Sequence, residues 1–200
     1  MLTKKSILNY AGILGVVLAF ILISFSFVIL LSRYSNIVVG AISDLGVYKE
    51  TSLLFTTTIF ISATLCGIFL YTFFDRFNIK SIVIKIISFF TYFILVGIGI
   101  FNYRDFSDLH RWLAFFYAVL FLVIVILIIK RFHKIFIYKT ASIILLVVYF
   151  LLLLTLCMLY LFNWENPNIL IPEIALFAIQ GIWIILSSVF MIVFKGRRNS

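Results

Sequence analysis

ILNYAGILGVVLAFILISFSFVILL, residues 7–31, decides the fold, because it runs for 25 residues without a charged side chain. A helix needs about 20 mostly apolar residues to cross the roughly 30 Å hydrocarbon layer of a bilayer. Lys4 and Lys5 precede the run, as in a secretory signal, but no small-x-small cleavage site follows it at 32–36. The stretch therefore predicts a retained transmembrane helix, about Ile7–Leu31.

Five further stretches have the same character. They are about Ser52–Phe74, Ile82–Phe101, Trp112–Ile129, Thr140–Phe162 and Pro172–Phe194. With 65% hydrophobic and 12% charged residues and a mean hydropathy of +1.27, the composition excludes a soluble globular domain. The loops are short and contain no linker-like or repeated sequence. We predict an all-α, polytopic integral membrane protein, a bundle of six transmembrane helices forming a single domain over residues 1–200.

The charged residues separate onto opposite ends of these spans. Twelve of the sixteen Lys and Arg residues fall at the end shared by the two termini. The base-poor end holds Arg33, Lys49, Arg104 and Arg111 and six of the seven acids, Asp44, Glu50, Asp105, Asp108, Glu165 and Glu173. Cytoplasmic loops carry an excess of basic residues. We therefore predict a multi-pass protein of the cell membrane, with the N and C termini cytoplasmic and the base-poor end outside.

Nothing in the sequence predicts a cofactor or a nucleic-acid partner. Cys66 and Cys157 each lie alone inside a span, which favours apolar core residues over a disulfide or a thiolate site. A haem would ordinarily take an axial His or Met from within a span, whereas His110 and His133 both lie at loops. One outer His without an outer Cys is too little for zinc, so we predict no metal, with a hard cation on the clustered carboxylates as the alternative. The pI of 9.7 is explained by basic loops beside the membrane.

The outer polar residues form three clusters, which meet only if the bundle closes around them. The clusters are Ser43-Asp44-Leu45-Gly46, residues 102–111, and Trp164-Glu165 together with Glu173. The middle cluster is the densest, and its His110 could serve in acid–base chemistry if a carboxylate of Asp44 or Glu173 fixed the imidazole tautomer.

The arginines and aspartates of the middle cluster allow two interpretations. Arg104 and Arg111 could hold a phosphate bidentately, as recognition of a lipid headgroup requires. Alternatively, Asp105 and Asp108 cap the following helix and pair with the two arginines. In both interpretations His110 shares one helical face with Ala114 and Tyr117.

Gln180 is the only amide in the middle of a predicted span. Because a polar side chain in hydrocarbon finds a partner wherever one exists, an interhelical hydrogen bond is the simpler interpretation. The alternative is a ligand contact at the floor of an outer pocket.

Several of these residues resemble a known pattern. Tyr34-Ser35, the segment Ile42-Ser43-Asp44-Leu45-Gly46, and then Phe55, Gly67, Phe101 and His110 follow one another along nearly the whole chain. This series resembles the membrane family called domain of unknown function 998. More distantly, the layout is similar to the DRAM/Sfk/Frag-type six-span membrane proteins, which include a lipid-remodelling factor for GPI anchors. The resemblance implies a role at a lipid headgroup, with Asp44 and His110 as the matched polar positions.

These observations lead to one main hypothesis and two alternatives. We expect an outward-facing site that binds or processes a lipid headgroup or a small polar ligand. Its candidate catalytic residues are Asp44 and His110, and its candidate ligand-binding residues are Ser43, Arg104, Asp108, Arg111, Glu173 and Gln180. The expected partners are membrane lipids. The first alternative is a non-catalytic subunit of a membrane protein complex, and the second is a transporter, which the nearly apolar span interiors disfavour. The residues name no particular reaction, so whether the protein is an enzyme stays open.

Overall fold

The computed structural model describes residues 8, 10–34, 39–101, 103, 105–132, 135–162 and 169–193. Its elements are α2 (Ala11–Arg33), the 3₁₀ turn η1 (Ile42–Gly46), α3 (Ser52–Arg76), α4 (Ile82–Ile100), α5 (Ser107–Arg131), α6 (Phe136–Phe162) and α7 (Leu170–Val193). All six α-helices are long and apolar enough to cross a membrane, and the described residues contain no strand. The predicted all-α bundle of six membrane-spanning helices is confirmed.

The helices differ from the predicted spans mainly where they begin. α5 begins at Ser107, ahead of the predicted Trp112, and Asp108 lies in its first turn, where a carboxylate favours the helix dipole. α7 begins at Leu170, so Pro172 lies in the first turn, where its missing N–H would have no intrahelical partner. The predicted limits Ile7 and Phe194 lie outside the described residues.

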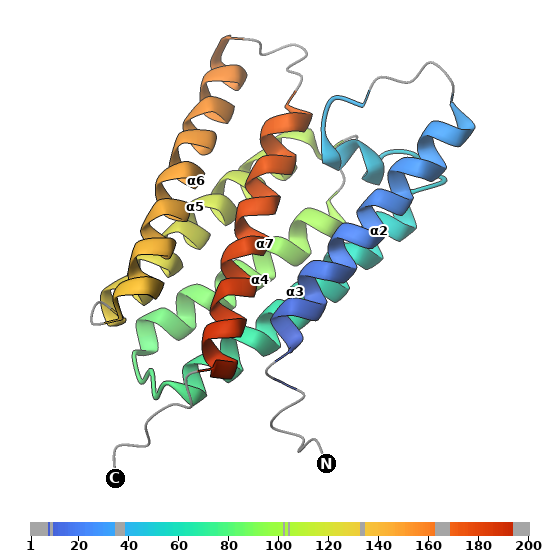
Figure 1. Cartoon of the computed structure of the whole chain (residues 1–200). Helices are drawn as coiled ribbons and strands as arrows, with labels where there is room; N and C mark the ends of the chain where they lie inside the picture. The colour runs from blue at the N-terminus through green and yellow to red at the C-terminus, as the bar shows by residue number, and fades with distance from the viewer. Residues whose placement is uncertain are drawn as a thin grey trace.

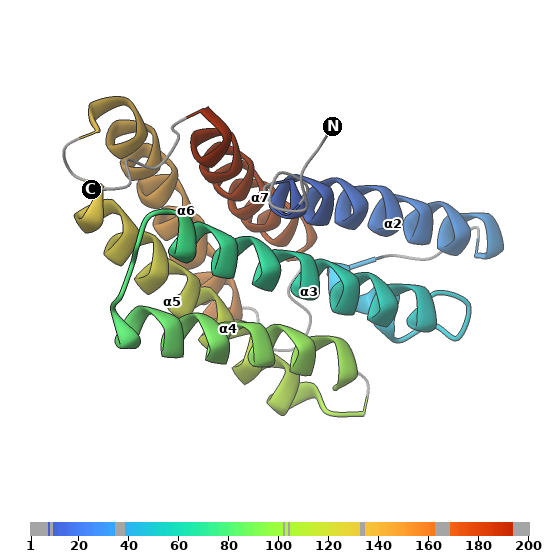
Figure 2. The ribbon, with the colours of Figure 1, turned by 90° about the horizontal axis from the view of Figure 1, so that it is seen from below.

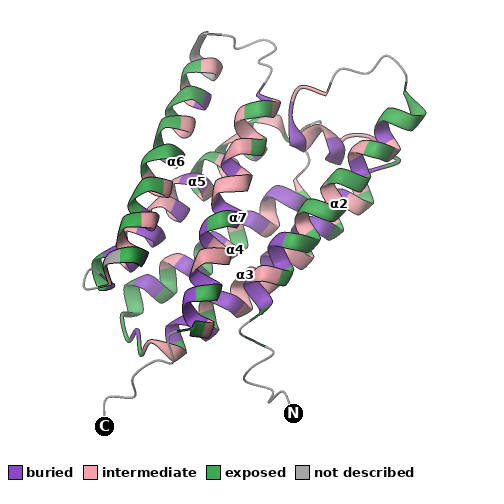
Figure 3. Ribbon diagram, in the orientation of Figure 1, coloured by how far each residue is buried: buried purple, intermediate pink, exposed green. Residues whose placement is uncertain are grey.

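The helices form a closed ring in chain order. Each packs against the next, and α7 returns to contact both α2 and α3 (Figures 1 and 2). α2 lies close to its neighbours because it carries glycine at the contacts: a Cβ on Gly12 would lie 2.9 Å from the ring of Phe69, and one on Gly15 would lie 3.0 Å from Leu65. Buried residues lie on the faces turned into the ring (Figure 3).

The two ends of the ring are packed differently. At the end where α3 and α5 finish, five rings contact one another with centroids 4.5 to 5.7 Å apart. We call these residues the aromatic cluster: Phe73, Phe77, Phe132, Tyr138 and Phe190. At the opposite end lie η1 and the starts of α5 and α7, which we call the polar end. A second group of buried residues, which includes Leu30, Leu45 and Phe55, fastens η1 onto α2 and α3 there.

Candidate functional site

Asp44 shapes the η1 segment. Its Oδ2 accepts hydrogen bonds from the backbone N–H of Gly40 (2.8 Å) and of Ala41 (3.0 Å). These two bonds hold the chain in a tight turn just before η1 begins. Asp44 does not line the cavity described below. In the structure the Asp44 carboxylate therefore stabilises the local backbone, whereas the sequence analysis proposed it as a catalytic residue.

Glu173 ties η1 to the start of α7. Its Oε2 accepts from the backbone N–H of Ile42 at 2.7 Å, although the two residues are 131 positions apart in sequence. A second link joins the same segments, because the N–H of Ile169 donates to the carbonyl of Gly40 at 2.9 Å. Glu173 is half-buried and lines a cavity beneath η1. Together these contacts place η1 as a cover over one side of that cavity.

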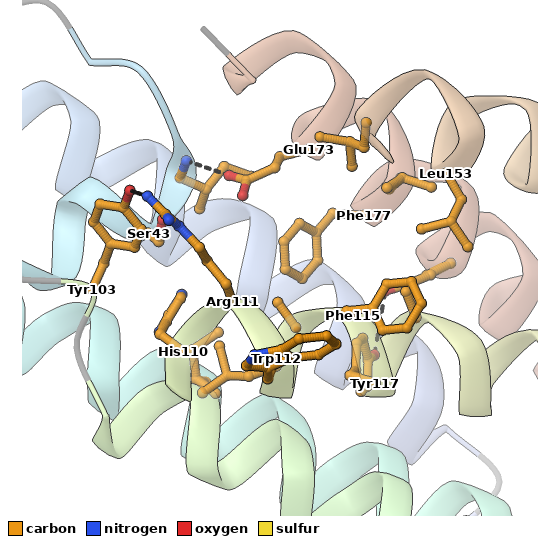
Figure 4. Close-up of a pocket in the computed structure, with 18 of the residues that line it drawn as sticks. Ser43, Tyr103, His110, Arg111, Trp112, Phe115, Tyr117, Leu153, Glu173 and Phe177 are labelled. Carbon is orange, nitrogen blue, oxygen red and sulfur yellow. Dashed lines mark hydrogen bonds between the residues drawn. The ribbon is translucent and has the colours of Figure 1, made fainter. Parts of the chain in front are cut away.

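The cavity has a volume of about 450 Å³ and lies at the polar end, between η1 and helices α3 to α7. Most of its lining is aliphatic or aromatic. The polar residues on its outer side are Ser43, Tyr103, Asp108, His110, Arg111 and Glu173 (Figure 4). Ligand pockets are typically about 300–1,000 Å³, mostly apolar, with a few polar groups that fix orientation. This cavity has the size and the lining of such a pocket.

His110 is buried in the first turn of α5, where it lines the cavity. Its Nδ1 lies 2.7 Å from the carbonyl oxygen of Phe101. Since a carbonyl only accepts, Nδ1 carries the proton, and in the neutral ring Nε2 keeps its lone pair. The group that fixes the tautomer is thus a backbone carbonyl, whereas the sequence suggested Asp44 or Glu173. The ring also meets that of Tyr103 edge-on, with centroids 6.0 Å apart.

Arg111 places a guanidinium group on the outer side of the cavity. Its Nη2 donates to the hydroxyl of Tyr103, and its Cζ lies 5.1 Å from the centre of that ring. Asp108 approaches Nη1 at 3.8 Å, but the Asp108 side chain is 86% exposed, so the pair contributes little to stability. Asp108 lies in the first turn of α5 near Arg111, as the alternative interpretation from sequence proposed, but the N-cap is Phe106 and forms no side-chain capping hydrogen bond, so the predicted capping by Asp108 is not found. Figure 4 shows the guanidinium group between Tyr103 and Ser43.

Gln180 forms the floor of the cavity with two tyrosines. Its Nε2 donates to the hydroxyl of Tyr149 at 2.9 Å, and its Oε1 accepts from the hydroxyl of Tyr117 at 3.2 Å. Tyr149 in turn donates to the carbonyl of Ala118 at 3.3 Å. The predicted interhelical hydrogen bond is confirmed and joins α5, α6 and α7. All three side chains also line the cavity, so Gln180 lies where the alternative, a ligand contact at the floor of a pocket, would place it as well.

Aromatic side chains form the wall between floor and polar side. Phe177 lies one turn after Glu173 on α7 and projects into the middle of the cavity (Figure 4). Trp112 and Phe115 approach from α5. These two residues are 59% and 41% exposed. They belong at once to the cavity wall and to the outer surface of a membrane-spanning helix, so the cavity wall reaches the lipid-facing side of α5.

The structure thus brings together most of the candidates that the sequence singled out. Ser43, Asp108, His110, Arg111, Glu173 and Gln180 line one cavity. His110, Ala114 and Tyr117 all face it, as their helical spacing predicted. Asp44 lies beside it. Arg104, together with Trp164, Glu165 and His133, lies outside the described residues.

Sequence reasoning missed Tyr103, Tyr149 and Phe177 as parts of the site. Phe177 had a readable signal, because Glu173, Phe177 and Gln180 are spaced four and three residues apart and so share one face of the last span. No sequence pattern indicated Tyr149, because its place in the site depends on contacts with α5 and α7.

The described residues contain no group of three or more His, Cys, Asp or Glu side chains that could hold a metal ion. Comparison of the chain with protein-family models, with curated proteins and with solved structures gives no match.

Proposed function

We propose that this protein binds a membrane lipid, with the headgroup at the polar side of the cavity and the apolar part against its aromatic wall. The observation that carries the proposal is the cavity itself: about 450 Å³, mostly apolar, with its charged side chains gathered on one side. A ligand that fills it must be amphipathic, because a polar molecule would leave its own groups unsatisfied against the wall.

The exposed wall residues favour a lipid over a water-soluble molecule. Trp112 and Phe115 lie both in the cavity and on the outer surface of α5. A lipid in the bilayer can therefore contact the cavity wall from the side. Arg111 presents several N–H donors to a headgroup phosphate, and Tyr103 holds it in place.

The charge pattern supports an outward-facing site in a cell membrane. The cavity lies at the base-poor end of the helices, and the positive-inside rule assigns that end to the non-cytoplasmic side. Both termini are then cytoplasmic. The resemblance to the domain of unknown function 998 family, and more distantly to the DRAM/Sfk/Frag-type proteins, belongs to the same proposal, since it implies a role at a lipid headgroup.

Binding is the activity that the cavity supports best, and His110 is the residue that would carry any turnover. Its Nδ1–H is held by Phe101, which leaves Nε2 as the atom able to accept a proton from a bound headgroup or water. Asp44 would then act on the site only through the shape of η1.

The test is to fill the cavity and measure the retained lipid. Ala114 lines the cavity from α5 and is half-buried, so Ala114→Phe should place a ring where the lipid lies. Val147→Phe is the matched control, because Val147 is 51% exposed on α6 and does not line the cavity. Native mass spectrometry of gently purified protein should find a specific lipid on the wild type and on Val147→Phe, and at least about tenfold less on Ala114→Phe.

Two outcomes would contradict the proposal. Equal lipid on all three proteins, matched for yield and melting temperature, would favour a structural subunit of a membrane complex. A water-soluble molecule in place of the lipid would favour the small polar ligand instead.

A further inference from the structure

Three charged side chains line the same largely apolar cavity: Asp108 and Arg111, which lie 3.8 Å apart, and Glu173. Arg111 comes from the first turns of α5 and Glu173 from the first turn of α7. The Glu173 carboxylate accepts the N–H of Ile42, but within the described part of the chain it forms no ion pair. A carboxylate that faces an apolar cavity is costly unless a cation or further donors meet it. A positive group placed beside Glu173 would stabilise the ionised carboxylate.

Aromatic rings adjoin that place. Phe177 lies one turn after Glu173, and Trp112 enters the same space from α5 (Figure 4). The faces of Trp and Phe rings attract ammonium groups, most strongly where water is excluded. A carboxylate together with aromatic rings is a suitable environment for an amine or a quaternary ammonium.

On the same polar side of the cavity, the surroundings of Arg111 suit an anion. Arg111 donates to the hydroxyl of Tyr103 and lies 3.8 Å from Asp108, and Figure 4 shows Ser43 beside it. One ligand with a phosphate near Arg111 and an ammonium near Glu173 would place each of its charges beside an opposite charge of the protein.

We propose that the ligand is a zwitterionic phospholipid, whose phosphate lies against Arg111 and whose ammonium lies between Glu173 and the rings of Trp112 and Phe177. This inference rests on the proposed lipid-binding function and names its ligand class. An anionic headgroup would bring a negative charge toward Glu173 without compensation, and a diacylglycerol would bring no charge to either Arg111 or Glu173.

The experiment is a competition among four lipids with identical acyl chains: phosphatidylethanolamine, phosphatidylcholine, phosphatidylglycerol and diacylglycerol. Binding to purified protein is read by native mass spectrometry. For the wild type we expect at least about tenfold tighter binding of a zwitterionic lipid than of phosphatidylglycerol. In Glu173→Gln the preference should fall below about threefold, because the amide can still accept the Ile42 N–H but carries no charge.

Glu50→Gln is the matched control. Glu50 is an exposed carboxylate at the same end of the bundle and does not line the cavity, so the wild-type preference should persist. Equal binding of phosphatidylglycerol and the zwitterionic lipids by the wild type would overturn the inference, whether or not Glu173→Gln folds. So would a preference that Glu173→Gln leaves unchanged. Saturable binding of none of the four lipids would instead contradict the proposed function itself.

Discussion

At one end of the bundle aromatic rings pack against each other, whereas at the other end aromatic rings surround a cavity of about 450 Å³. The arrangement of α5 and α6 accounts for the difference. Phe132 follows α5 and Tyr138 lies near the start of α6, and both belong to the aromatic cluster. The buried residues of α5 concentrate at the same end, from Ala118 to Ile129. The first half of α5 and the second half of α6 line the cavity instead. The cavity is lined by many apolar side chains, but α5 and α6 diverge toward this end of the bundle (Figure 1).

This difference implies a division of labour between the ends. Atoms that line an empty space lose dispersion contacts, so the cavity contributes less stability than a filled core of the same residues. The aromatic cluster supplies contacts that the polar end does not. Stability and ligand binding should therefore respond to substitutions at different ends.

The largest effect on stability is expected from Phe73→Ala in the aromatic cluster. Phe73 is fully buried and contacts the rings of Phe77 and Phe132. Lipid removes the hydrophobic driving force between helices, so the expected loss is the packing and cavity share of such a substitution, roughly 2–4 kcal/mol. Thermal unfolding in detergent measures it, and the lipid bound below the melting temperature should not change.

Phe25→Ala is the control for that experiment, because Phe25 is 56% exposed on α2 and faces away from the bundle interior. Its melting temperature should stay close to that of the wild type. A similar loss of melting temperature in Phe73→Ala and Phe25→Ala would mean that the aromatic cluster has no special role in stability. It would contradict the proposed difference between the two ends.

An intermediate effect is expected from Asp44→Ala at the polar end. The substitution removes the acceptor of two backbone N–H groups, which should cost about 1–2 kcal/mol. Asp44→Asn should recover a large part of that loss, since its carboxamide oxygen still accepts. Melting temperatures in detergent distinguish the three proteins.

The same variants separate a structural from a chemical role. If Asp44→Ala unfolds at the wild-type temperature yet loses its bound lipid, then Asp44 acts on the ligand directly. His110→Ala provides the reference, because His110 lines the cavity and Asp44 does not.

The sequence predicts the fold well because one physical requirement dominates it. Each span must be about 20 apolar residues long, and that requirement can be read from composition alone. The collection of polar residues at one end was equally readable, since Ser43, His110 and Arg111 all follow from the order of loops and spans. Gln180 was readable for the same reason, as an amide in hydrocarbon must find a partner.

The different packing of the two ends could not be predicted from the sequence. The chain has 24 phenylalanines, and nothing in the local sequence separates buried Phe73 from Phe25 on the lipid-facing surface. Contacts between distant segments were also hidden, as Glu173 with the N–H of Ile42 shows. The role of Asp44 depends on backbone geometry that only the folded turn before η1 provides.

The smallest effect is expected from Tyr34→Phe, which tests an exposed bond at the polar end. The hydroxyl of Tyr34 donates to Oε1 of Glu50 at 3.2 Å. This bond raises the pKa of Tyr34 above its usual value near 10, and the negative charge of Glu50 adds to the shift. A group whose pKa is raised on folding contributes stability below its unfolded pKa and loses it as the pH rises through the folded value. The difference in melting temperature between wild type and Tyr34→Phe should therefore be small at neutral pH, begin to shrink near pH 10 and vanish only above the raised pKa of folded Tyr34. Tyr71→Phe, an exposed tyrosine with no hydrogen bond among the described residues, should show no difference at any pH. A Tyr34→Phe loss as large as that of Asp44→Ala would contradict this ranking, and would mean that the exposed contacts of the polar end hold η1 as firmly as the buried ones.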